Sequence, residues 1–416
     1  MKVCVIGSGG REHALAWRLS ISPSVTKVYA IPGSAAMSDC AELVGIDWQQ
    51  SDHLISFLKD NQVNLVVVGP EAPLVAGLAD VLNKAGIPVF GPSKAAAQLE
   101  GSKVFAKDLM KKYNIPTAAY GVFHKVDEAK TFIAQIGAPI VVKADGLAAG
   151  KGVVVAMTVD EANEAVEDML SGNRFGDAGS TVVIEEFMEG EEASLLAFVD
   201  SKTVVPMIAS QDHKRIFDGD KGANTGGMGT YAPAPVLTDA LRDEAMKTIL
   251  EPMVAAMEKE GMPYVGCLYA GLMITDEGPK VVEFNARFGD PETQVVLPLL
   301  DSDLGQIMMA CATGILTVDM VKWKDSSAAC VILASKGYPE TSSKGDVISG
   351  DIKQYDTTIV FHSGTKLVGE NYVTNGGRVL GVVGLGKDLR TALDRAYGRI
   401  EHIDFEGMQY RTDIGA

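Results

Sequence analysis

The sequence predicts a multidomain protein of mixed α/β and α+β class. It should contain an N-terminal doubly wound parallel α/β domain, a central region of two α+β subdomains and a small C-terminal α+β domain. Over residues 1–102, short apolar runs alternate with amphipathic segments, which is the pattern of βαβ units. From about residue 121, paired apolar runs around a glycine-rich loop replace this alternation. The expected domains are 1–102, 103–326 with a small subdomain at about 121–190, and 327–416.

Each domain has its own succession of elements. In the N-terminal domain, periodicity predicts strands at 2–7, 28–31, 65–68 and 88–90 and helices at about 11–20 and 74–85. In the central region it predicts strands at 140–144, 152–156, 181–187, 193–199, 204–209, 269–274 and 280–285, and helices at 161–170, 239–260 and 304–314. The runs at 193–199 and 204–209 look antiparallel and are assigned to the small subdomain. The C-terminal domain has short strands, a turn at 375–377 (NGG) and a helix at about 389–400.

Composition and charge restrict the classes of partner. The chain has 416 residues, 47% hydrophobic and 22% charged, as in ordinary soluble globular proteins. A net charge of -17 repels nucleic acids and anionic membranes, so local basic groups must capture any anionic ligand. No apolar run approaches the ~20 residues of a membrane span, and the first strand starts at Lys2, which leaves no room for a signal peptide. We expect a cytoplasmic monomer that binds small molecules, without nucleic-acid or membrane partners.

Cysteine and histidine offer no catalytic arrangement. The five cysteines are widely spaced and form no CxxC pair for zinc or redox chemistry. Cys4, Cys267 and Cys330 lie inside apolar runs and are expected to be buried small hydrophobic side chains, which fits a reducing compartment. No Ser/His/Asp or Cys/His arrangement emerges, and histidines such as His13 and His362 are expected at the surface or satisfied in the core.

The most informative stretch is 282–294 (VEFNARFGDPETQ), which begins as a strand and ends in a turn. Strand alternation sends Val282, Phe284 and Ala286 to one face and 283, 285 and 287 to the other. The second face therefore carries the oxygens of Glu283 and Asn285, which suit a hard cation such as Mg²⁺. The guanidinium at position 287 suits a phosphate or a carboxylate. Together these groups can handle a nucleoside triphosphate beside an anionic substrate.

A first glycine loop at residues 7–12 (GSGGRE) follows the first strand. A dinucleotide fingerprint needs a glycine where Glu12 stands, and only Asp39 is a loose candidate for the ribose-binding acid, so NAD or FAD is disfavoured. Two readings remain. The loop is either a tight strand–helix turn or a helix N-terminus that binds a single substrate phosphate.

A second glycine loop at residues 143–152 (KADGLAAGKG) resembles a phosphate-binding P-loop but fails its pattern. The glycine spacing is one residue short, and Gly152 stands where Ser or Thr is required. Because the loop links two strands, a glycine-rich hairpin that folds over phosphates is the better interpretation. Lys143 would lie on a rigid strand and Lys151 on the mobile hairpin. An unpaired ammonium in an apolar strand is costly to bury, which favours a functional role for Lys143.

Two further polar stretches are weak signals when taken alone. Residues 183–192 (VIEEFMEGEE) lead a strand into an acidic turn that could read an adenine edge and a ribose, although acidic turns are usually solvated. Residues 210–215 (SQDHKR) and 224–231 (NTGGMGTY) place charged residues beside a glycine loop. A surface loop is the ordinary interpretation. Combined with 283–287, these segments predict a site for a small zwitterion and a phosphate.

In this order, the lysine, the glycine hairpin, the acidic hinge and the Glu-x-Asn pair resemble the ATP-grasp superfamily. More specifically, the chain resembles the phosphoribosylamine–glycine ligase family, also called glycinamide ribonucleotide synthetase. The motifs that carry this resemblance are 7–13 (GSGGREH), 69–71 (GPE), 143–146 (KADG), 211–214 (QDHK), 224–229 (NTGGMG), 287–292 (RFGDPE) and 410–415 (YRTDIG). They span nearly the whole chain, and its length fits the monofunctional bacterial type.

The resemblance implies a central ATP-grasp fold and ATP-dependent ligation of glycine to 5-phosphoribosylamine through glycyl phosphate. The products would be glycinamide ribonucleotide, ADP and phosphate, in de novo purine (IMP) biosynthesis. It implies Mg²⁺ or Mn²⁺ on Glu283 and Asn285. The implied ATP contacts are Lys103, Lys143, Gly150, Lys151, Glu185, Phe187, Met188 and Glu192. The implied substrate contacts are Gly9, Gly10, Glu71, Asp212 and Arg287, and the implied catalytic residues are Arg287, Asp212 and Lys214.

One departure from the wider superfamily concerns the metal. Many relatives carry a further acidic ligand on the preceding strand, but residues 269–271 (YAG) contain none. We therefore expect ATP oxygens and water to complete the coordination, so that metal binding depends on nucleotide. Two alternatives stay open: another ATP-grasp enzyme, such as a carboxylase relative, and a non-enzymatic nucleotide sensor. A sensor would have no need of Arg287 beside the metal pair.

Overall fold

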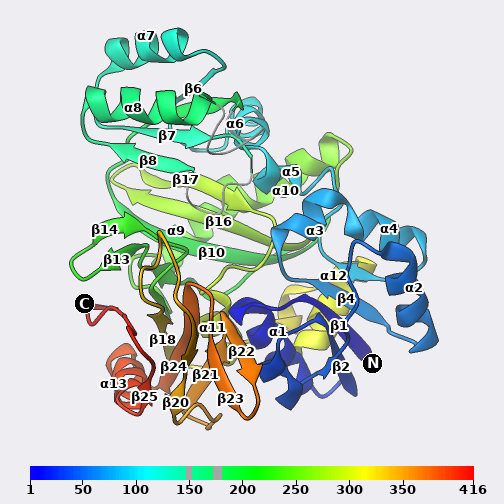
Figure 1. The fold of residues 1–416 in the computed structure, drawn as a ribbon. Coiled ribbons are helices and arrows are strands. Elements are labelled where there is room, and N and C mark those ends of the chain that lie inside the picture. The colour runs from blue at the N-terminus through cyan, green and yellow to red at the C-terminus, as the bar shows by residue number, and fades with distance from the viewer. Residues whose placement is uncertain (147–151, 172–179) are drawn as a thin grey trace.

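The computed structural model describes residues 1–146, 152–171 and 180–416. A parallel sheet, two central sheets and a C-terminal sheet make up most of the molecule (Figure 1). Within these described ranges, no helix is long and apolar enough to cross a membrane.

The N-terminal domain contains a five-stranded parallel sheet in the order β3-β2-β1-β4-β5, which confirms the predicted class. Its strands are β1 (Lys2–Gly7), β2 (Lys27–Pro32), β3 (Glu42–Leu43), β4 (Leu65–Val68) and β5 (Val89–Phe90). Its helices are α1 (Gly10–Ser20), η1 (Ala35–Asp39), α2 (Ser51–Asp60), α3 (Glu71–Ala76) and α4 (Leu78–Lys84). The helix predicted at 74–85 is split, because Gly77 adopts a left-handed φ of +96° that ends α3.

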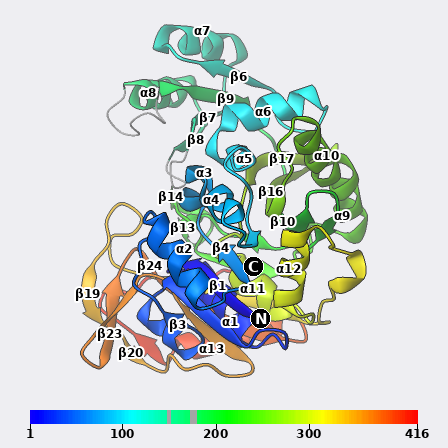
Figure 2. The same cartoon turned by 90° about the vertical axis from the view of Figure 1, so that its right-hand side faces the viewer.

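The small central subdomain, here called the lid, has a sheet in the order β6-β9-β7-β8. Its elements are β6 (Tyr120–Phe123), α7 (Val126–Ile136), β7 (Ile140–Ala144), β8 (Val153–Ala156), α8 (Val159–Leu170) and β9 (Val182–Glu186). Val142 and Ile184 pack under the two helices in one apolar core. Figures 1 and 2 both show α7 and α8 on the outside of the lid, so the opposite face of its sheet points toward the larger central sheet.

The larger central sheet has the order β11-β10-β16-β17. Its strands are β10 (Glu191–Asp200), β11 (Val204–Pro206), β16 (Val265–Thr275) and β17 (Gly278–Asn285). The antiparallel pair β10 and β11 was assigned to the small subdomain, and this assignment is wrong. Strand β10 pairs with β16 along its whole length, so the pair belongs to the larger sheet. Strand periodicity identifies a strand but not its partner.

Helices border the larger sheet on several sides. They are α5 (Gln98–Gly101), α6 (Lys103–Lys112), α9 (Asp239–Ala245), α10 (Glu251–Lys259), α11 (Thr293–Leu299) and α12 (Leu304–Thr313). The helix predicted at 239–260 consists of α9 and α10 joined by the π-helical turn Met246–Leu250.

The C-terminal sheet has the order β12-β15-β18-β24-β21. These strands are β12 (Gln211–Asp212), β15 (Gly229–Ala232), β18 (Ser327–Ala334), β21 (Thr358–His362) and β24 (Arg378–Gly386), and α13 (Leu389–Ile400) packs against them. Shorter elements are β13 (Arg215–Phe217), β14 (Lys221–Asn224), η4 (Val318–Met320), β19 (Lys344–Val347), β20 (Ser349–Gly350), β22 (Thr365–Val368), β23 (Asn371–Asn375) and β25 (Ile403–Asp404). Two strands from the central region, β12 and β15, therefore belong to the C-terminal sheet.

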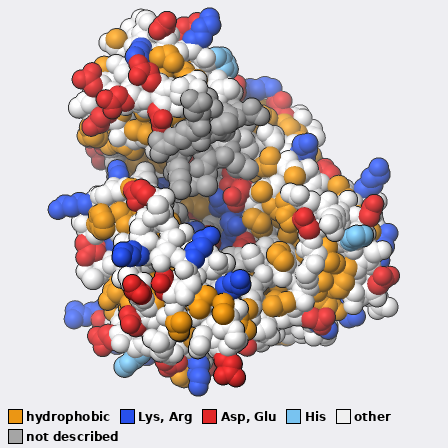
Figure 3. All heavy atoms as spheres, viewed as in Figure 1, with side chains coloured by type: hydrophobic (Ala, Val, Ile, Leu, Met, Phe, Trp, Pro, Cys, Tyr) orange, Lys and Arg blue, Asp and Glu red, His pale blue; other side chains and the backbone are white. Residues whose placement is uncertain are grey.

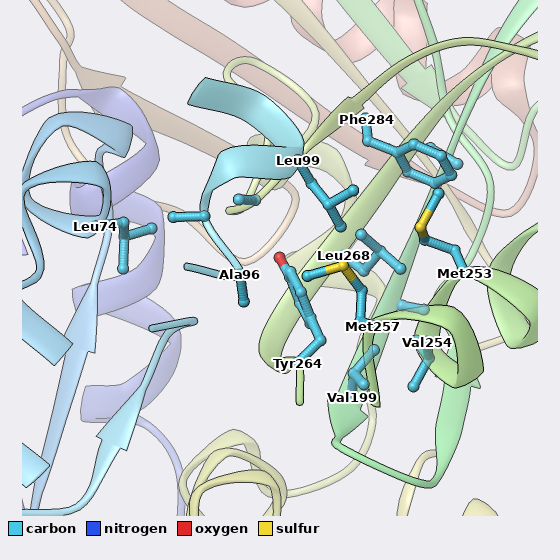
Figure 4. Close-up of a cluster of buried hydrophobic side chains, with 14 of the residues drawn as sticks. Leu74, Ala96, Leu99, Val199, Met253, Val254, Met257, Tyr264, Leu268 and Phe284 are labelled. Carbon is cyan, nitrogen blue, oxygen red and sulfur yellow. The ribbon is translucent and has the colours of Figure 1, made fainter. Parts of the chain in front are cut away.

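The N-terminal domain and the larger central sheet share one apolar core (Figure 4). Leu74 and Leu99 enter it from the N-terminal side, and Met257 and Tyr264 enter it from the central region. The Tyr264 side chain is fully buried, and its hydroxyl donates to the Cys267 carbonyl at 2.6 Å. This core fixes the position of α5 against β17, next to the predicted metal residues.

Candidate active site

The face of the lid sheet opposite α7 and α8 carries two of the predicted nucleotide contacts. In the register of β7 and β9, Val141 pairs with Glu185, and Lys143 lies two residues further along β7 on the same face. Lys143 and Glu185 are both buried, and Lys143 Nζ lies 3.0 Å from Glu185 Oε2. Lys143 Nζ also donates to the Val282 carbonyl of β17 at 3.1 Å. Both side chains therefore lie between the lid and the larger sheet.

A second lysine, which the sequence analysis missed, contacts the same carboxylate. Lys107 Nζ lies 3.0 Å from Glu185 Oε2, whereas the buried Oε1 has no hydrogen bond within the described parts of the chain. Burial lowers the pKa of Lys107 to about 8, against the opposing effect of the Glu185 charge. Phe187 and Met188 lie half-buried in the turn after β9. A free carboxylate oxygen beside ammonium groups and apolar side chains can hold a heterocycle with an amino group.

The predicted phosphate contact Lys103 is oriented by Asp145. The Asp145 carboxylate accepts from the Lys103 backbone N–H at 2.6 Å, and from the next amide at 3.3 Å, so it caps the start of α6. Lys103 Nζ donates to the Gly146 carbonyl at 3.0 Å. Burial lowers the pKa of Lys103, although Glu283 acts in the opposite direction. The acid in the KADG motif thus fixes a lysine forty-two positions earlier in the chain.

Strand β17 is irregular at the predicted metal residues. Gly271 pairs with Glu283, and a register shift directly after Gly271 leaves Val282 as an extra residue in a β-bulge. Val281 and Phe284 belong to one apolar core, whereas Val282 is only half-buried and lies outside it. The prediction that Val282 shares the face of Phe284 is therefore wrong. The bulge also turns the Val282 carbonyl to Lys143.

The predicted metal pair offers one carboxylate and one amide oxygen. Burial raises the pKa of Glu283, but the charges of three lysines and Arg287 outweigh burial and hold this pKa below its usual value. The lysines are Lys214, Lys143 and Lys103. Gly271, directly opposite Glu283, contributes no side chain, and no cluster of three or more His, Cys, Asp or Glu residues is found in the described ranges. An ionised Glu283 and the oxygen of Asn285 fit a hard divalent cation that takes its other ligands from elsewhere.

Arg287 is held by carboxylates from the N-terminal part of the chain. Its Nη2 lies 2.7 Å from Glu100 Oε1, and its Nε lies 3.3 Å from Glu71 Oε2. A further contact of 3.3 Å joins Arg287 Nη2 to Asn285 Oδ1. Burial raises the pKa of Glu100, whose other oxygen accepts from the Ala286 amide at 2.8 Å. The guanidinium therefore has a fixed position between the metal pair and Glu71.

The first glycine loop holds a carboxylate of the chain itself. Glu12 is 3% exposed, and its Oε2 accepts from the Gly9 amide at 2.7 Å. A Cβ at Gly7 would lie 2.4 Å from Glu12 Cγ, and one at Gly69 would lie 2.3 Å from Glu12 Oε1. These glycines thus make room for Glu12, and the Gly9 amide is already bonded. Gly10 permits the approach of the C-terminal region, because a Cβ there would lie 2.3 Å from Ser363 Oγ.

Arg11 connects this loop to the rest of the site. Its Nε donates to Glu12 Oε1 at 2.6 Å, and one terminal nitrogen donates to the Phe288 carbonyl at 3.2 Å. The same nitrogen lies 3.9 Å from Glu71 Oε2. Burial raises the pKa of Glu71, but Arg287 and Arg11 together lower it below its usual value. Glu71 therefore stays ionised between two guanidinium groups.

The predicted glycine-binding residues lie on β12 and in the segment that follows it. Burial raises the pKa of Asp212 to about 7, and Lys214 lowers it only in part. Lys214 forms an ion pair with Glu192. The pKa of Lys214 is raised, because the charges of Glu192 and Asp212 outweigh its burial. Lys214 therefore pairs with Glu192, the residue that was predicted to bind the ribose of ATP.

Arg378 is another residue that the sequence analysis missed. Its Nη1 donates to the Gly226 carbonyl at 2.6 Å and to the Asp290 carbonyl at 2.8 Å. A Cβ at Gly226 would lie 2.9 Å from Arg378 Cζ, and one at Gly227 would lie 2.6 Å from Pro291 Cδ. The two glycines of the NTGG motif thus allow this loop to pack closely against Arg378 and against the RFGDP turn.

The hollowed face in Figure 3 shows basic and acidic side chains together below the grey residues. Gly150 and Lys151, two predicted ATP contacts, lie outside the described residues. A cavity of about 590 Å³ opens at the carboxyl ends of the N-terminal strands and is lined by residues 7–9, Glu12, Asp47 and Trp48, among others. It thus adjoins the glycine loop that was predicted to face a substrate.

Models of the phosphoribosylglycinamide synthetase family match the chain in three parts. The N domain matches residues 1–100, the ATP-grasp domain matches 101–293 and the C domain matches 328–416. The chain belongs to this family. It is an enzyme of the ligase class with the ATP-grasp fold.

Members of this synthetase family align with the chain over its full length. The phosphoribosylamine–glycine ligase of Halalkalibacterium halodurans is 52% identical, covering 100% of this chain and 97% of the relative. That of Neisseria meningitidis is 53% identical, covering 100% and 98%. A crystal structure of the Thermotoga maritima ligase has a TM-score of 0.88 at 34% identity and covers 100% of both chains. A 2-oxoglutarate carboxylase domain from Hydrogenobacter thermophilus, solved with MgADP and bicarbonate, shares the fold with a TM-score of 0.75 at 17% identity, covering 98% and 91%.

The candidate site of this synthetase also contains residues that the sequence analysis did not identify. Glu100 and Lys107 are isolated charges in helical segments, and each becomes informative only when a distant partner is known. Asp145 and Arg378 lie in or beside recognised motifs, and the KADG motif could have pointed to the first of them. Helix capping and the packing of glycines on a guanidinium are contacts between segments far apart in the sequence.

Proposed function

We propose that this chain joins glycine to 5-phosphoribosylamine with ATP, through glycyl phosphate, and releases glycinamide ribonucleotide, ADP and phosphate. The observation that carries the proposal is the position of Arg287. It contacts the metal residue Asn285 on one side and Glu71 of the N-terminal domain on the other. A nucleotide cleft and an acceptor site therefore meet at one guanidinium.

The nucleotide lies between the lid and the larger sheet in this proposal. Lys103 and Lys143 neutralise its phosphates, and Glu185, Phe187 and Met188 contact the adenine. Glu192 accepts from the ribose after its ion pair with Lys214 opens. Gly150 and Lys151 complete the phosphate contacts. The same triphosphate supplies the phosphoryl group for the first chemical step.

Glu283 and Asn285 hold the divalent cation, which we infer to be Mg²⁺ or Mn²⁺. Their fit rests on the ionised carboxylate and the amide oxygen described above. When bound, such a cation neutralises the charge that develops on the transferring phosphoryl group. Since two protein oxygens are few for such an ion, nucleotide oxygens and water supply its other ligands.

The first step transfers the γ-phosphoryl group of ATP to a carboxylate oxygen of glycine and releases ADP. Asp212 holds the glycine ammonium, and Lys214 and Arg287 stabilise the negative charge of the transferring group. In the second step, the phosphoribosylamine nitrogen attacks the acyl carbon. The C–O bond breaks, phosphate leaves with the electron pair, and the nitrogen loses one proton.

Phosphoribosylamine lies between Glu71 and the cavity beside Gly9 and Gly10. The Glu71 carboxylate suits the amine and the ribose hydroxyls of this substrate. The Gly9 amide is bonded to Glu12, so we place no substrate phosphate on that amide.

An ADP-release assay tests the function. Activity should require glycine and freshly generated phosphoribosylamine together, and omission of either should abolish the formation of glycinamide ribonucleotide. Bicarbonate and other amino acids serve as controls for a carboxylase-like activity. ADP release that follows bicarbonate and ignores glycine would refute the proposal.

We also infer a cytoplasmic, monomeric enzyme. Cys4, Cys267, Cys311 and Cys330 are buried free thiols, as suits a reducing compartment. Light scattering of the purified protein would test the oligomeric state.

A further inference from the structure

Glu185 lies in an asymmetric environment at the lid sheet. Its side chain is 2% exposed. Both ammonium groups, from Lys107 and Lys143, lie 3.0 Å from Oε2, whereas Oε1 is buried and lacks a hydrogen bond within the described residues. An acceptor in this condition is costly unless a ligand donates to it. The arrangement leaves one oxygen of a fixed carboxylate ready for a donor.

Lys107, which lies on α6, is held in place by contacts other than its ion pair with Glu185. It is 2% exposed, and its Nζ donates to Thr117 Oγ1 at 2.8 Å. Thr117 in turn donates to the Val281 carbonyl at 2.7 Å. The Tyr120 ring centroid lies 5.7 Å from the same ammonium. These contacts hold Lys107 in place, so its charge remains with Glu185.

Lys143 is in a different position. Besides Glu185, it contacts the Val282 carbonyl at the edge of the metal pair, and its charge acts on Glu283. Under the proposed function, Lys143 turns its charge to the ATP phosphates. Glu185 would then be a buried carboxylate with one resident counter-ion.

We propose that Lys107 is a positioning residue for nucleobase selection: it fixes the orientation of the Glu185 carboxylate, so that Oε1 accepts a hydrogen bond from the amino group of adenine and repels the carbonyl group of guanine. This inference rests on the proposed use of ATP. A carboxylate oxygen attracts an N–H donor and repels a carbonyl oxygen. Lys107 itself touches neither the nucleotide nor the reacting atoms.

Nucleotide binding to the complete protein tests the inference without any ligation chemistry. ATP and GTP dissociation constants should be measured by calorimetry with Mg²⁺ for wild type, Lys107→Met and Lys107→Arg. We expect Lys107→Met to weaken ATP binding by at least ~10-fold, the range for a lost hydrogen bond to a charged group, and to change GTP binding by less than ~2-fold. Lys107→Arg should restore most of the preference. Lys111→Met, at an exposed position one turn further along the same helix, is the matched control and should leave both constants unchanged.

Steady-state kinetics give a second readout. In Lys107→Met, KM for ATP should rise while kcat with saturating ATP stays within ~3-fold, because the lysine acts on binding rather than on the reacting atoms. A parallel loss of ATP and GTP affinity would overturn the inference, as would an unchanged ratio or a wild type without ATP preference. If wild type binds ATP but forms no product with glycine and phosphoribosylamine, the proposed function fails separately.

A double variant keeps the test decisive if Lys107→Met does not fold. Glu185→Gln removes the buried charge that needs Lys107, so Glu185→Gln with Lys107→Met leaves no unpaired carboxylate. We expect the double variant to have the ATP-to-GTP ratio of Glu185→Gln alone. A further loss of ATP preference in the double variant would contradict the proposed coupling.

Discussion

The nucleotide cleft and the first glycine loop look alike in sequence and differ in their unused hydrogen-bonding groups. Both combine a strand end with glycines and charged residues. In the cleft, Lys107 and Lys143 contact one oxygen of Glu185, and the other oxygen has no hydrogen bond within the described parts of the chain. In the loop, Glu12 already accepts from Gly9 and Arg11. A ligand site needs groups that the fold itself has not paired, and only the three-dimensional contacts reveal which groups those are.

The largest expected effect is at Arg287, which contacts both regions. Arg287→Ala should lower kcat by about 10³-fold, the upper range for removal of one group that stabilises transition-state charge. ATP should still bind, which calorimetry would show. Because the variant leaves Glu100 buried without its partner, Arg287→Lys is the control for stability. Near-normal turnover in Arg287→Ala would remove this residue from the mechanism.

A metal titration tests the cleft next. Without nucleotide, Mn²⁺ binding followed by paramagnetic resonance should be weak, since the described residues offer only Glu283 and Asn285. Addition of an unreactive ATP analogue should strengthen it. In the presence of nucleotide, Glu283→Gln should weaken Mn²⁺ binding by at least ~10-fold. Mutation of residues that only hydrogen-bond to a metal ligand already causes a loss of this size. Tight stoichiometric binding to the nucleotide-free protein would show that a ligand has been overlooked.

The raised pKa of Asp212 predicts that the KM for glycine depends on pH. Because its folded pKa is about 7, Asp212 gains a proton as the pH falls through 7 and loses its attraction for the glycine ammonium. KM for glycine should then rise toward ~10-fold per pH unit below 7. Asp212→Asn should have a raised KM without this slope. A wild-type KM that is flat from pH 6 to 8 would contradict the assignment.

The raised pKa of Asp212 also predicts how the stability of the fold changes with pH. The folded pKa of Asp212 lies above its usual 3.8, so the folded state binds the proton more tightly than the unfolded state. Its contribution should stabilise the fold below pH 4 and be lost progressively as the pH rises to 7. Urea unfolding of wild type and Asp212→Asn should therefore converge at low pH and differ most at pH 7.

The smallest effect is expected in the glycine loop. Glu12→Gln keeps the shape of the side chain and weakens its bonds to Gly9 and Arg11. It should lower the free energy of unfolding by about 2 kcal/mol, within the range for a hydrogen bond to a charged group, with kcat within a few-fold of wild type. Urea denaturation would measure this. If kcat falls as far as in Arg287→Ala, Glu12 touches the reacting groups and the contrast between the two regions is wrong.

Much of the fold follows from local sequence patterns. The parallel sheet, the lid strands around the glycine loop and the strand that carries Glu283 were predicted from periodicity and turn residues. Partner choice was not, because β10 has the same alternation whether it pairs in the lid or with β16. The helix break at Gly77 and the bulge at Val282 were not predicted either, because each depends on local backbone geometry.

The candidate site was predictable where its residues are adjacent in sequence. Glu283, Asn285 and Arg287 lie together because one strand end carries them. Lys107 and Glu100 were missed, because their partners lie tens to hundreds of positions away and a lone charge in a helix is usually solvated. Contacts between residues so far apart in the sequence could not be predicted from local patterns.

The strand order β12-β15-β18-β24-β21 has a consequence for the nascent chain. The segment with Asp212 is built well before β18 and β24, yet β15 pairs with β18 and β18 pairs with β24. Until the last quarter of the protein has been synthesised, β12 can pair only with β15 and, through Ser210, with β10. Synthesis therefore delivers the lid first, and the sheet that carries Asp212 cannot be completed before β18 and β24 have emerged.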